Sequence, residues 1–436
     1  MITNISALIN INESNINKSN TGQAQGINRC HLLGYVSNEL SVCEQLKINF
    51  DNVKNDPQAV LQAAVKRWGH HVNQFLVGDY VLVWQAEEHL LITSSARASF
   101  TVYYQKDDAF ALSSDLNTLG KTLSESQLLQ NLTLGPLTTQ RTCFNNVCQL
   151  QPGETLVWKT DDAAQLTHQV QLAHQAQLPK TQQVELAQLV QTPEATTLER
   201  QDVDLGELVN HLPQLAYRLG EPVTDAILAH FDQEIGACVE NTVVLDAKWL
   251  AARKKHGAQP FKQNYNWCKG LLNNQLSRHK KQLKKYHDAL RSEHAAAQVE
   301  QSQTFEQWID FNYVLPAWCQ LLQRIARLHG KTLVNPFIVP EQAMALVKQG
   351  EQQDDQPQGY FSLQQDSINN VFDAMQRLFH IGEPDTLTLF NLNPHATAKL
   401  VSQHASQKNA NPRRIEQLCI VLLTFDYLAR FNRATP

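Results

Sequence analysis

Several features that mark particular protein classes are missing from this sequence of 436 residues. Its eight cysteines are scattered and no Cys-x-x-Cys pair occurs, so we expect free thiols in a reducing cytoplasm, with a Cys143–Cys148 disulfide as the alternative. Residues 1–26 lack the basic region and the sustained apolar stretch of a signal peptide. The longest apolar run near the C-terminus, Cys419 to Phe425, is far shorter than the ~20 residues of a membrane span.

Charged side chains and glycine are also sparse. Charged residues make up 18% of the chain, below the usual level of about 25%. The 37 basic and 42 acidic residues give a formal net charge of −5, which excludes a globally basic nucleic-acid binder but not a local basic patch. Between residues 154 and 219 the only glycine is Gly206. The length predicts two or three domains, and an apolar content of 42% predicts globular ones.

Residues 29–160 have the pattern of one α+β unit that follows a leader extension at 1–28. Asp56 as N-cap and Pro57 in the first turn predict the start of a helix, which Gly69 ends. Short β-rich runs then alternate with turn residues, and these predict an antiparallel meander. The predicted strands cover 31–36, 80–84, 90–93, 101–104, 109–112, 149–150 and 155–158.

The second half, residues 203–436, is mainly helical in its periodicity. It follows a polar, glutamine-rich stretch at 161–202, which we interpret as a linker. Its one clean strand pattern is Thr242–Leu245. The predicted helices cover 206–219, 225–236, 270–298, 305–329, 340–349, 365–381 and 412–432.

Four stretches of the first half follow one another in the order and spacing of a known family. They are Asp56–Gly69, Phe75–Tyr80, Tyr103–Leu116 and Thr142–Gly153. They are similar to that family's helix ending in Arg-Trp-Gly, its Leu-x-Gly-Asp-Phe strand, its Leu-Tyr-Tyr run and its Leu-x-Pro-Gly turn. The sequence therefore resembles the N-terminal domain of the asparagine synthetase family. The resemblance implies an Ntn-hydrolase-like, class II glutamine amidotransferase fold, which β-lactam synthetases and lasso-peptide cyclases share.

The second half resembles the same family in three places. Leu212–Asp225, Cys238–Leu245 and Gly330–Phe337 are similar to the family's segments around its Glu-Pro-x-x-Asp, core strand and Pro-Phe-Leu-Asp motifs. The resemblance implies that residues 203–436 form a mostly helical, truncated α/β synthetase-like domain.

The residues that would hydrolyse glutamine do not match the family. Its nucleophile is a cysteine that directly follows the initiator Met and uses its own α-amine as base. Residue 2 here is Ile2, and the first cysteine, Cys30, could act only if processing exposed it; we favour an ordinary strand thiol. The family's Arg-Asp-x-x-Gly loop aligns with Ser94–Ala98, which lacks the Asp and the Gly. We therefore do not expect glutaminase activity.

The ATP site implied by the resemblance is also incomplete. The family cradles pyrophosphate in a Ser-Gly-Gly-x-Asp-Ser loop, and this sequence contains none. About 53 residues separate Trp158 from Leu212, too few for a linker plus two βα units. The acidic position of the Pro-Phe-Leu-Asp motif is Val339 here.

Three carboxylates remain near the implied metal site. Glu221, Asp225 and Asp246 form a candidate relic acidic cluster for Mg²⁺, although ordinary surface carboxylates are the interpretation we favour. His70 and His71 lack an acidic or thiol partner at ligand spacing, so we interpret them as a surface pair at a helix end.

One predicted helix is strongly basic. Its candidate partner-binding residues are Arg278, Lys280, Lys281, Lys284, Lys285 and Arg291. An acidic partner or nucleic acid could bind such a face, and a solvated outer face is the plainer alternative. Its single aromatic residue, Tyr286, makes nucleic acid the less favoured ligand.

These observations lead to two hypotheses about function. The first is a degenerate, non-catalytic binding or accessory subunit with no cofactor, which acts beside an intact synthetase-like protein or a precursor peptide in a biosynthetic pathway. The alternative is an active ATP-dependent, amide-forming ligase that uses ATP and Mg²⁺ in a diverged nucleotide site. In both cases we expect a cytoplasmic protein without a membrane partner, and self-association is compatible with either.

Overall fold

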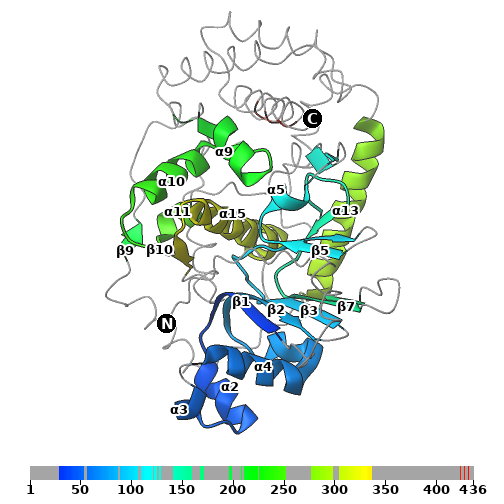
Figure 1. Ribbon diagram of the computed structural model, residues 1–436. Helices are drawn as coiled ribbons and strands as arrows, with labels where there is room; N and C mark the ends of the chain where they lie inside the picture. Colours follow the sequence, from blue (N-terminus) through cyan, green and yellow to red (C-terminus); the bar gives the residue numbers. More distant parts are fainter. Residues whose placement is uncertain are drawn as a thin grey trace, which may run out of the picture.

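Figure 1 shows the protein as a computed structural model. The described part comprises much of the chain between residues 29 and 335, with gaps, and three positions near the C-terminus. It consists of residues 29–53, 56–86, 89–106, 110–120, 122–124, 127–128, 141–159, 167–170, 196–198, 208, 211–223, 225–251, 276–297, 304–335, 423, 427 and 431. The predicted leader at 1–28 and the predicted helices at 340–349 and 365–381 lie outside the described residues.

The first half is built on an antiparallel sheet with the strand order β1-β2-β3-β7-β8. The strands are β1 (Arg29–Val36), β2 (Gly78–Gln85), β3 (His89–Ser94), β7 (Glu154–Lys159) and β8 (Thr167–Val170). Along β2, Val81 and Val83 join one buried cluster while Tyr80 and Leu82 join another, because successive side chains point to opposite faces. A strand covered on both faces is apolar throughout, which is why the sequence predicted it.

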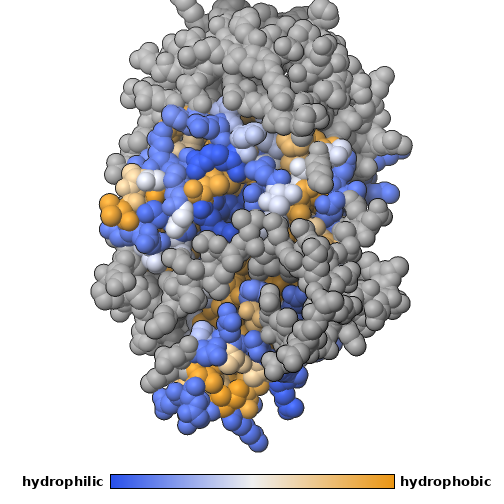
Figure 2. Space-filling view, viewed as in Figure 1, coloured by the Kyte–Doolittle hydropathy of each residue, from blue (hydrophilic) through white to orange (hydrophobic). Residues whose placement is uncertain are grey.

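A helical layer covers one face of this sheet. It consists of α2 (Glu39–Leu46), α3 (Phe50–Val53), α4 (Pro57–Trp68) and the 3₁₀ helix η1 (Gly69–Gln74). The predicted start of α4 is confirmed, since the Asp56 carboxylate accepts a hydrogen bond of 3.1 Å from the Ala59 N–H. Gly69 ends α4 with φ +58°, as predicted. Figure 2 shows apolar residues gathered at this end of the molecule, where Leu40 is 50% exposed.

A second antiparallel sheet covers the other face, with the order β5-β4-β6. Its strands are β4 (Tyr103–Lys106), β5 (Phe110–Ser113) and β6 (Val147–Gln149), and the short helix α5 (Leu116–Leu119) follows β5. The predicted strand at 101–104 begins two residues later than expected. A buried cluster that includes Ile92, Tyr104, Phe110 and Leu156 fills the space between the two sheets. The predicted antiparallel α+β layout is confirmed.

The second half contains a small parallel sheet with the order β11-β10-β9. Its strands are β9 (Thr196–Leu198), β10 (Thr242–Leu245) and β11 (Thr332–Val334). The prediction of β10 is confirmed, whereas β9 and β11 were not predicted. Both β8 and β9 lie inside the stretch 161–202 that we interpreted as a linker, so its described residues, 167–170 and 196–198, are strands.

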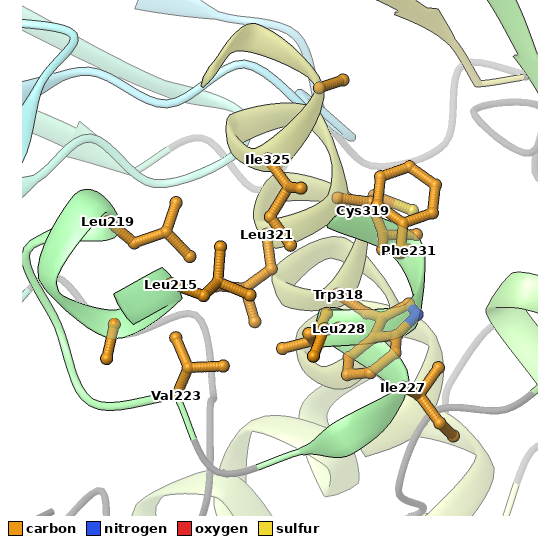
Figure 3. Packing of buried hydrophobic residues seen from close by; sticks show 14 of the residues in the cluster. Leu215, Leu219, Val223, Ile227, Leu228, Phe231, Trp318, Cys319, Leu321 and Ile325 are labelled. Carbon is orange, nitrogen blue, oxygen red and sulfur yellow. The ribbon is translucent and has the colours of Figure 1, made fainter. Parts of the chain in front are cut away.

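Helices pack around this parallel sheet. They are α9 (Leu212–Leu219), α10 (Ala226–Ala237), α11 (Ala247–Ala251) and α15 (Leu315–Leu328). The prediction for 225–236 is confirmed, and Asp225 caps α10 by accepting from the Ile227 N–H at 3.1 Å. Of the helix predicted at 206–219, the structure describes α9 as the C-terminal part. Figure 3 shows apolar side chains of α9 and α10 meeting the apolar face of α15.

One hydrophobic cluster joins the two halves. Tyr103, Phe144 and Val147 of the first half belong to the same buried cluster as Phe231 and Trp318 of the second. The covered face of the β5-β4-β6 sheet is thus part of the core around α15. We predicted domain boundaries at residues 160 and 203. The buried cluster contains described residues from both sides of these positions.

The remaining described helices lie between α11 and β11. α13 (Leu276–Ala297) lies within the predicted helix 270–298, and α14 (Phe305–Ile309) leads through a π-helical turn, η3 (Asp310–Val314), into α15. In the predicted helix 412–432, only Leu423, Tyr427 and Phe431 are described; all three are helical. No helix in the described ranges is long and apolar enough to cross a membrane.

Candidate functional site

Cys30, the one candidate nucleophile, lies in strand β1. A catalytic nucleophile needs access to solvent. The Cys30 backbone pairs with Trp84 of β2, and its side chain is 3% exposed within the apolar layer beneath α4. Burial raises the pKa of the Cys30 thiol to about 12. A thiol in this state is protonated at neutral pH and acts as a small apolar side chain. The six described cysteines are all free thiols, so the Cys143–Cys148 alternative is wrong.

The loop Ser94–Ala98, which aligned with a catalytic motif, contacts the helical half. The Arg97 guanidinium lies 3.6 Å from the centre of the Phe311 ring in η3, a cation–π contact. The Gln320 side-chain amide donates to the Ala98 carbonyl at 3.2 Å and accepts from the Gln149 amide at 2.8 Å. The loop is therefore fixed between the two halves.

Asp79 holds the other end of this loop. Its carboxylate is fully buried and accepts hydrogen bonds from the Ser99 hydroxyl and from the Ser99 N–H, the latter at 2.8 Å. Burial raises the pKa of Asp79 to about 6, although the bonds from Ser99 and Phe100 oppose the shift. Gly34 of β1 lies beside it with φ +95°, and a Cβ there would come within 2.0 Å of the Asp79 carbonyl oxygen.

The C-terminus of α9 is a meeting point for distant parts of the chain. The last carbonyls of a helix have no partner within the helix. Here Asn117 donates to the carbonyls of Tyr217 and Arg218 at 3.3 and 3.2 Å, and Arg324 donates to that of Leu219. We call this region the α9 hub.

The α9 hub continues at the next residues. The Gly220 carbonyl accepts from the Tyr427 hydroxyl at 2.7 Å and from the Cys143 thiol at 3.3 Å. Glu221, a predicted relic carboxylate, forms an ion pair with Arg324. Burial alone would lower the pKa of Arg324, but the Glu221 carboxylate reverses this and raises it. The α9 hub satisfies its own charges and carbonyls, so its geometry is that of a structural junction.

The structure places the other two predicted carboxylates at helix starts. Asp225 caps α10, and Asp246 accepts from the Lys248 N–H at 2.7 Å at the start of α11. Among the described residues, no group of three or more His, Cys, Asp or Glu side chains is arranged to hold a metal ion. Each of the three predicted carboxylates therefore has a local structural role.

Trp249 occupies the carboxyl end of the parallel sheet, which is where α/β folds bind nucleotides. Its side chain is fully buried, and its indole N–H donates to the carbonyl of Leu198, the last residue of β9, at 2.9 Å. The Trp318 indole in turn donates to the Trp249 carbonyl at 3.0 Å. The Phe231 ring packs edge-on against Trp249 with centroids 5.0 Å apart. An indole thus fills the space next to these strand ends.

The remaining predicted residues lie at the surface. Lys281, Lys284, Lys285 and Arg291 are exposed on α13, while the side chains of Arg278 and Lys280 lie outside the described residues. His70 and His71 follow the end of α4, with ring centroids 3.9 Å apart and ring planes tilted by 46°; His70 is exposed and His71 is partly buried.

The first half of the chain is similar to a known family. A family described as a glutamine amidotransferase domain matches residues 31–169. These residues form a glutamine amidotransferase-like domain. Glutamine phosphoribosylpyrophosphate amidotransferase from B. subtilis, solved with ADP and GMP, matches 34% of this chain and 30% of its own at 15% identity, with a TM-score of 0.23. The chain thus spans less than a third of that protein's length. No curated protein matches the chain.

The sequence did contain a signal for the polar contacts that α15 makes with the first half and with the α9 hub, and we did not use it. α15 has an apolar face of Leu, Ile and Trp residues, yet Gln320 and Arg324 lie on the same buried side, one turn apart. Polar side chains on a core-facing helix stripe need partners. Their spacing alone therefore indicated a buried polar junction, although not which residues complete it.

Proposed function

We propose that this protein is a non-catalytic binding or accessory subunit built on a glutamine amidotransferase-like domain. The observation that carries the proposal is the position of Cys30, which lies inside a paired strand with a buried thiol whose pKa is raised to about 12. Glutamine hydrolysis in this fold needs an exposed, activated nucleophile, and here the first cysteine of the domain has neither a free α-amine nor access to solvent.

The parallel sheet supports the same proposal independently. Trp249 fills the carboxyl end of the sheet and bonds to Leu198, and Asp246 caps α11. The Trp249 indole therefore occupies space that a nucleotide would need at this end of the sheet, and one Asp246 oxygen is used in the helix cap. The fixed α9 hub and the docked loop Ser94–Ala98 suit a rigid scaffold.

Glutamate release from glutamine tests the glutaminase part of the proposal. Purified full-length protein and the Cys30→Ser variant are incubated with glutamine, and glutamate is measured. We expect both to remain at the background rate of buffer. A rate above background that Cys30→Ser abolishes would contradict the proposal, and a single cooperative thermal transition in both samples shows that they are folded.

The alternative function, an asparagine-synthetase-like ligase with a diverged nucleotide site, makes a different prediction. It requires micromolar affinity for MgATP and release of pyrophosphate or AMP in the presence of an amine and a carboxylate. Calorimetric titration with MgATP separates the two hypotheses, and our proposal predicts no saturable heat. Micromolar binding of MgATP would contradict our proposal and favour the ligase.

A further inference from the structure

The basic part of α13 carries charges that the rest of the described structure does not neutralise. Lys281, Lys284 and Lys285, which we call the α13 lysine cluster, are exposed. The ion pairs within the described part of the chain involve other side chains, and no described residue is a polar partner of these three lysines. The whole chain has a net charge of −5, so this cluster is a local exception to its overall charge.

The arrangement of the cluster is unfavourable for the helix by itself. Lysines three and four residues apart lie on the same side of a helix and repel each other. The first turn of α13 has no acidic residue, and Asp288, four residues after Lys284, is the single carboxylate within one turn of the cluster on its C-terminal side. An anionic partner would relieve the repulsion that remains.

The C-terminal half of α13 fixes the helix on the protein. Leu290 is buried in a small cluster with Trp308 and Ile309 of α14. The Tyr313 hydroxyl donates to the Glu293 carboxylate at 2.8 Å, and the Arg291 guanidinium lies 5.0 Å from the Phe305 ring centre. The lysine cluster is therefore presented from an anchored helix at the edge of the molecule (Figure 1).

We propose that the α13 lysine cluster docks an acidic segment of a partner polypeptide. Three charges within one helical turn span about 6 Å along the axis, a distance that neighbouring carboxylates of an acidic peptide match. Nucleic acid fits less well. Its recognition uses many phosphate contacts and exposed rings for stacking, whereas the one aromatic residue here, Tyr286, is partly buried in the cluster beneath α13. This inference rests on the proposed accessory function and specifies an acidic polypeptide segment as what the subunit binds.

Fluorescence anisotropy of the full-length protein tests this proposal with defined probes. The probes are a labelled peptide of twelve glutamates and a labelled single-stranded RNA of twelve nucleotides, each titrated at 50 and 200 mM NaCl. One variant carries Lys281→Glu, Lys284→Glu and Lys285→Glu. The matched control reverses the same number of exposed basic residues elsewhere, with Lys66→Glu, Arg67→Glu and Lys248→Glu.

We expect the peptide to bind the wild type, to bind more weakly at 200 mM NaCl, and to lose at least tenfold in affinity in the α13 variant but less than twofold in the control. Equal losses in both variants, no peptide binding by the wild type at 50 mM NaCl, or tighter binding of RNA than of peptide would each overturn the proposal. Far-UV circular dichroism confirms that the variants are folded. The glutamate-release assay is independent of this one, so the failure of one proposal is distinguishable from the failure of the other.

Discussion

The buried carboxylate Asp79 provides a quantitative test of the first half of the structure. Its pKa rises from 3.8 to about 6 because it is desolvated, and Asn at the same position can keep a hydrogen bond from the Ser99 N–H while removing the charge. A shift of this size corresponds to about 3 kcal/mol of differential stability between the protonated and ionised forms. Asp79→Asn therefore isolates the contribution of this one ionisation.

The sign follows from the direction of the shift. Because the folded pKa of Asp79 is raised, the native state binds more protons than the unfolded state between pH 3.8 and about 6. The contribution of Asp79 to stability is thus most favourable below pH 3.8 and is lost as the pH rises through 6. Of this contribution of about 3 kcal/mol, about 2 kcal/mol is lost between pH 4.5 and pH 7.5.

The assay is urea unfolding of the wild type and of Asp79→Asn at several pH values between 4.5 and 7.5. We expect the unfolding free energy of the variant, relative to that of the wild type, to increase by about 2 kcal/mol across this range. All other ionisable groups are common to the two proteins and cancel in the difference. A difference that stays constant within about 0.5 kcal/mol, or that falls as the pH rises, would refute the proposed burial of this carboxylate.

Three further predictions concern single positions and are measured by urea unfolding at pH 7. Glu221→Ala leaves the Arg324 guanidinium without its counter-ion and should cost about 3 kcal/mol, while Glu221→Gln should cost less because it keeps a hydrogen-bond acceptor. Trp249→Ala opens a cavity and leaves the Leu198 carbonyl without its donor, so we expect a loss of about 3–5 kcal/mol. Gly34→Ala should prevent folding or cost more than about 4 kcal/mol, because its Cβ would overlap the Asp79 carbonyl oxygen. Gly69→Ala, whose Cβ meets nothing within 4 Å, should cost only the backbone strain of its positive φ, about 1–3 kcal/mol. Equal costs at the two glycines would contradict the close contact at β1.

The shared hydrophobic cluster predicts cooperative unfolding of the two halves. Residues of both halves lie in one buried cluster around α15. We therefore expect tryptophan fluorescence and far-UV circular dichroism to report one coincident transition. Two separate transitions would show that the halves fold independently.

Local signals explain which elements were predictable from the sequence. The start of α4 depends on Asp56 and Pro57, which are adjacent in the sequence. A continuous apolar run predicts β2. The strands β9 and β11 have three residues each and pair with β10 across long separations. Thr196 of β9 pairs with Val243, 47 residues away, and Thr332 of β11 pairs with Thr242, 90 residues away. No local pattern distinguishes such short segments from loop.

The contacts of the candidate site also join residues that are far apart in the sequence. The resemblance directed attention to Glu221 as a relic metal carboxylate, but its partner is Arg324, 103 residues away. The carbonyl of Gly220 is bonded to Tyr427 across 207 residues. Contacts at such separations are set by how the helices pack, so the sequence offered Glu221 as a relic or a surface carboxylate and did not indicate its ion pair with Arg324.

The most direct test of the central claim is the reactivity of Cys30 in the native protein. The protein is treated with iodoacetamide, digested and mapped by mass spectrometry, with the more exposed Cys238 as the internal comparison. We predict that Cys238 is modified under native conditions, whereas Cys30 is modified only after unfolding. Modification of native Cys30 at a rate equal to or faster than that of Cys238 would contradict the claim that this domain lacks an accessible nucleophile.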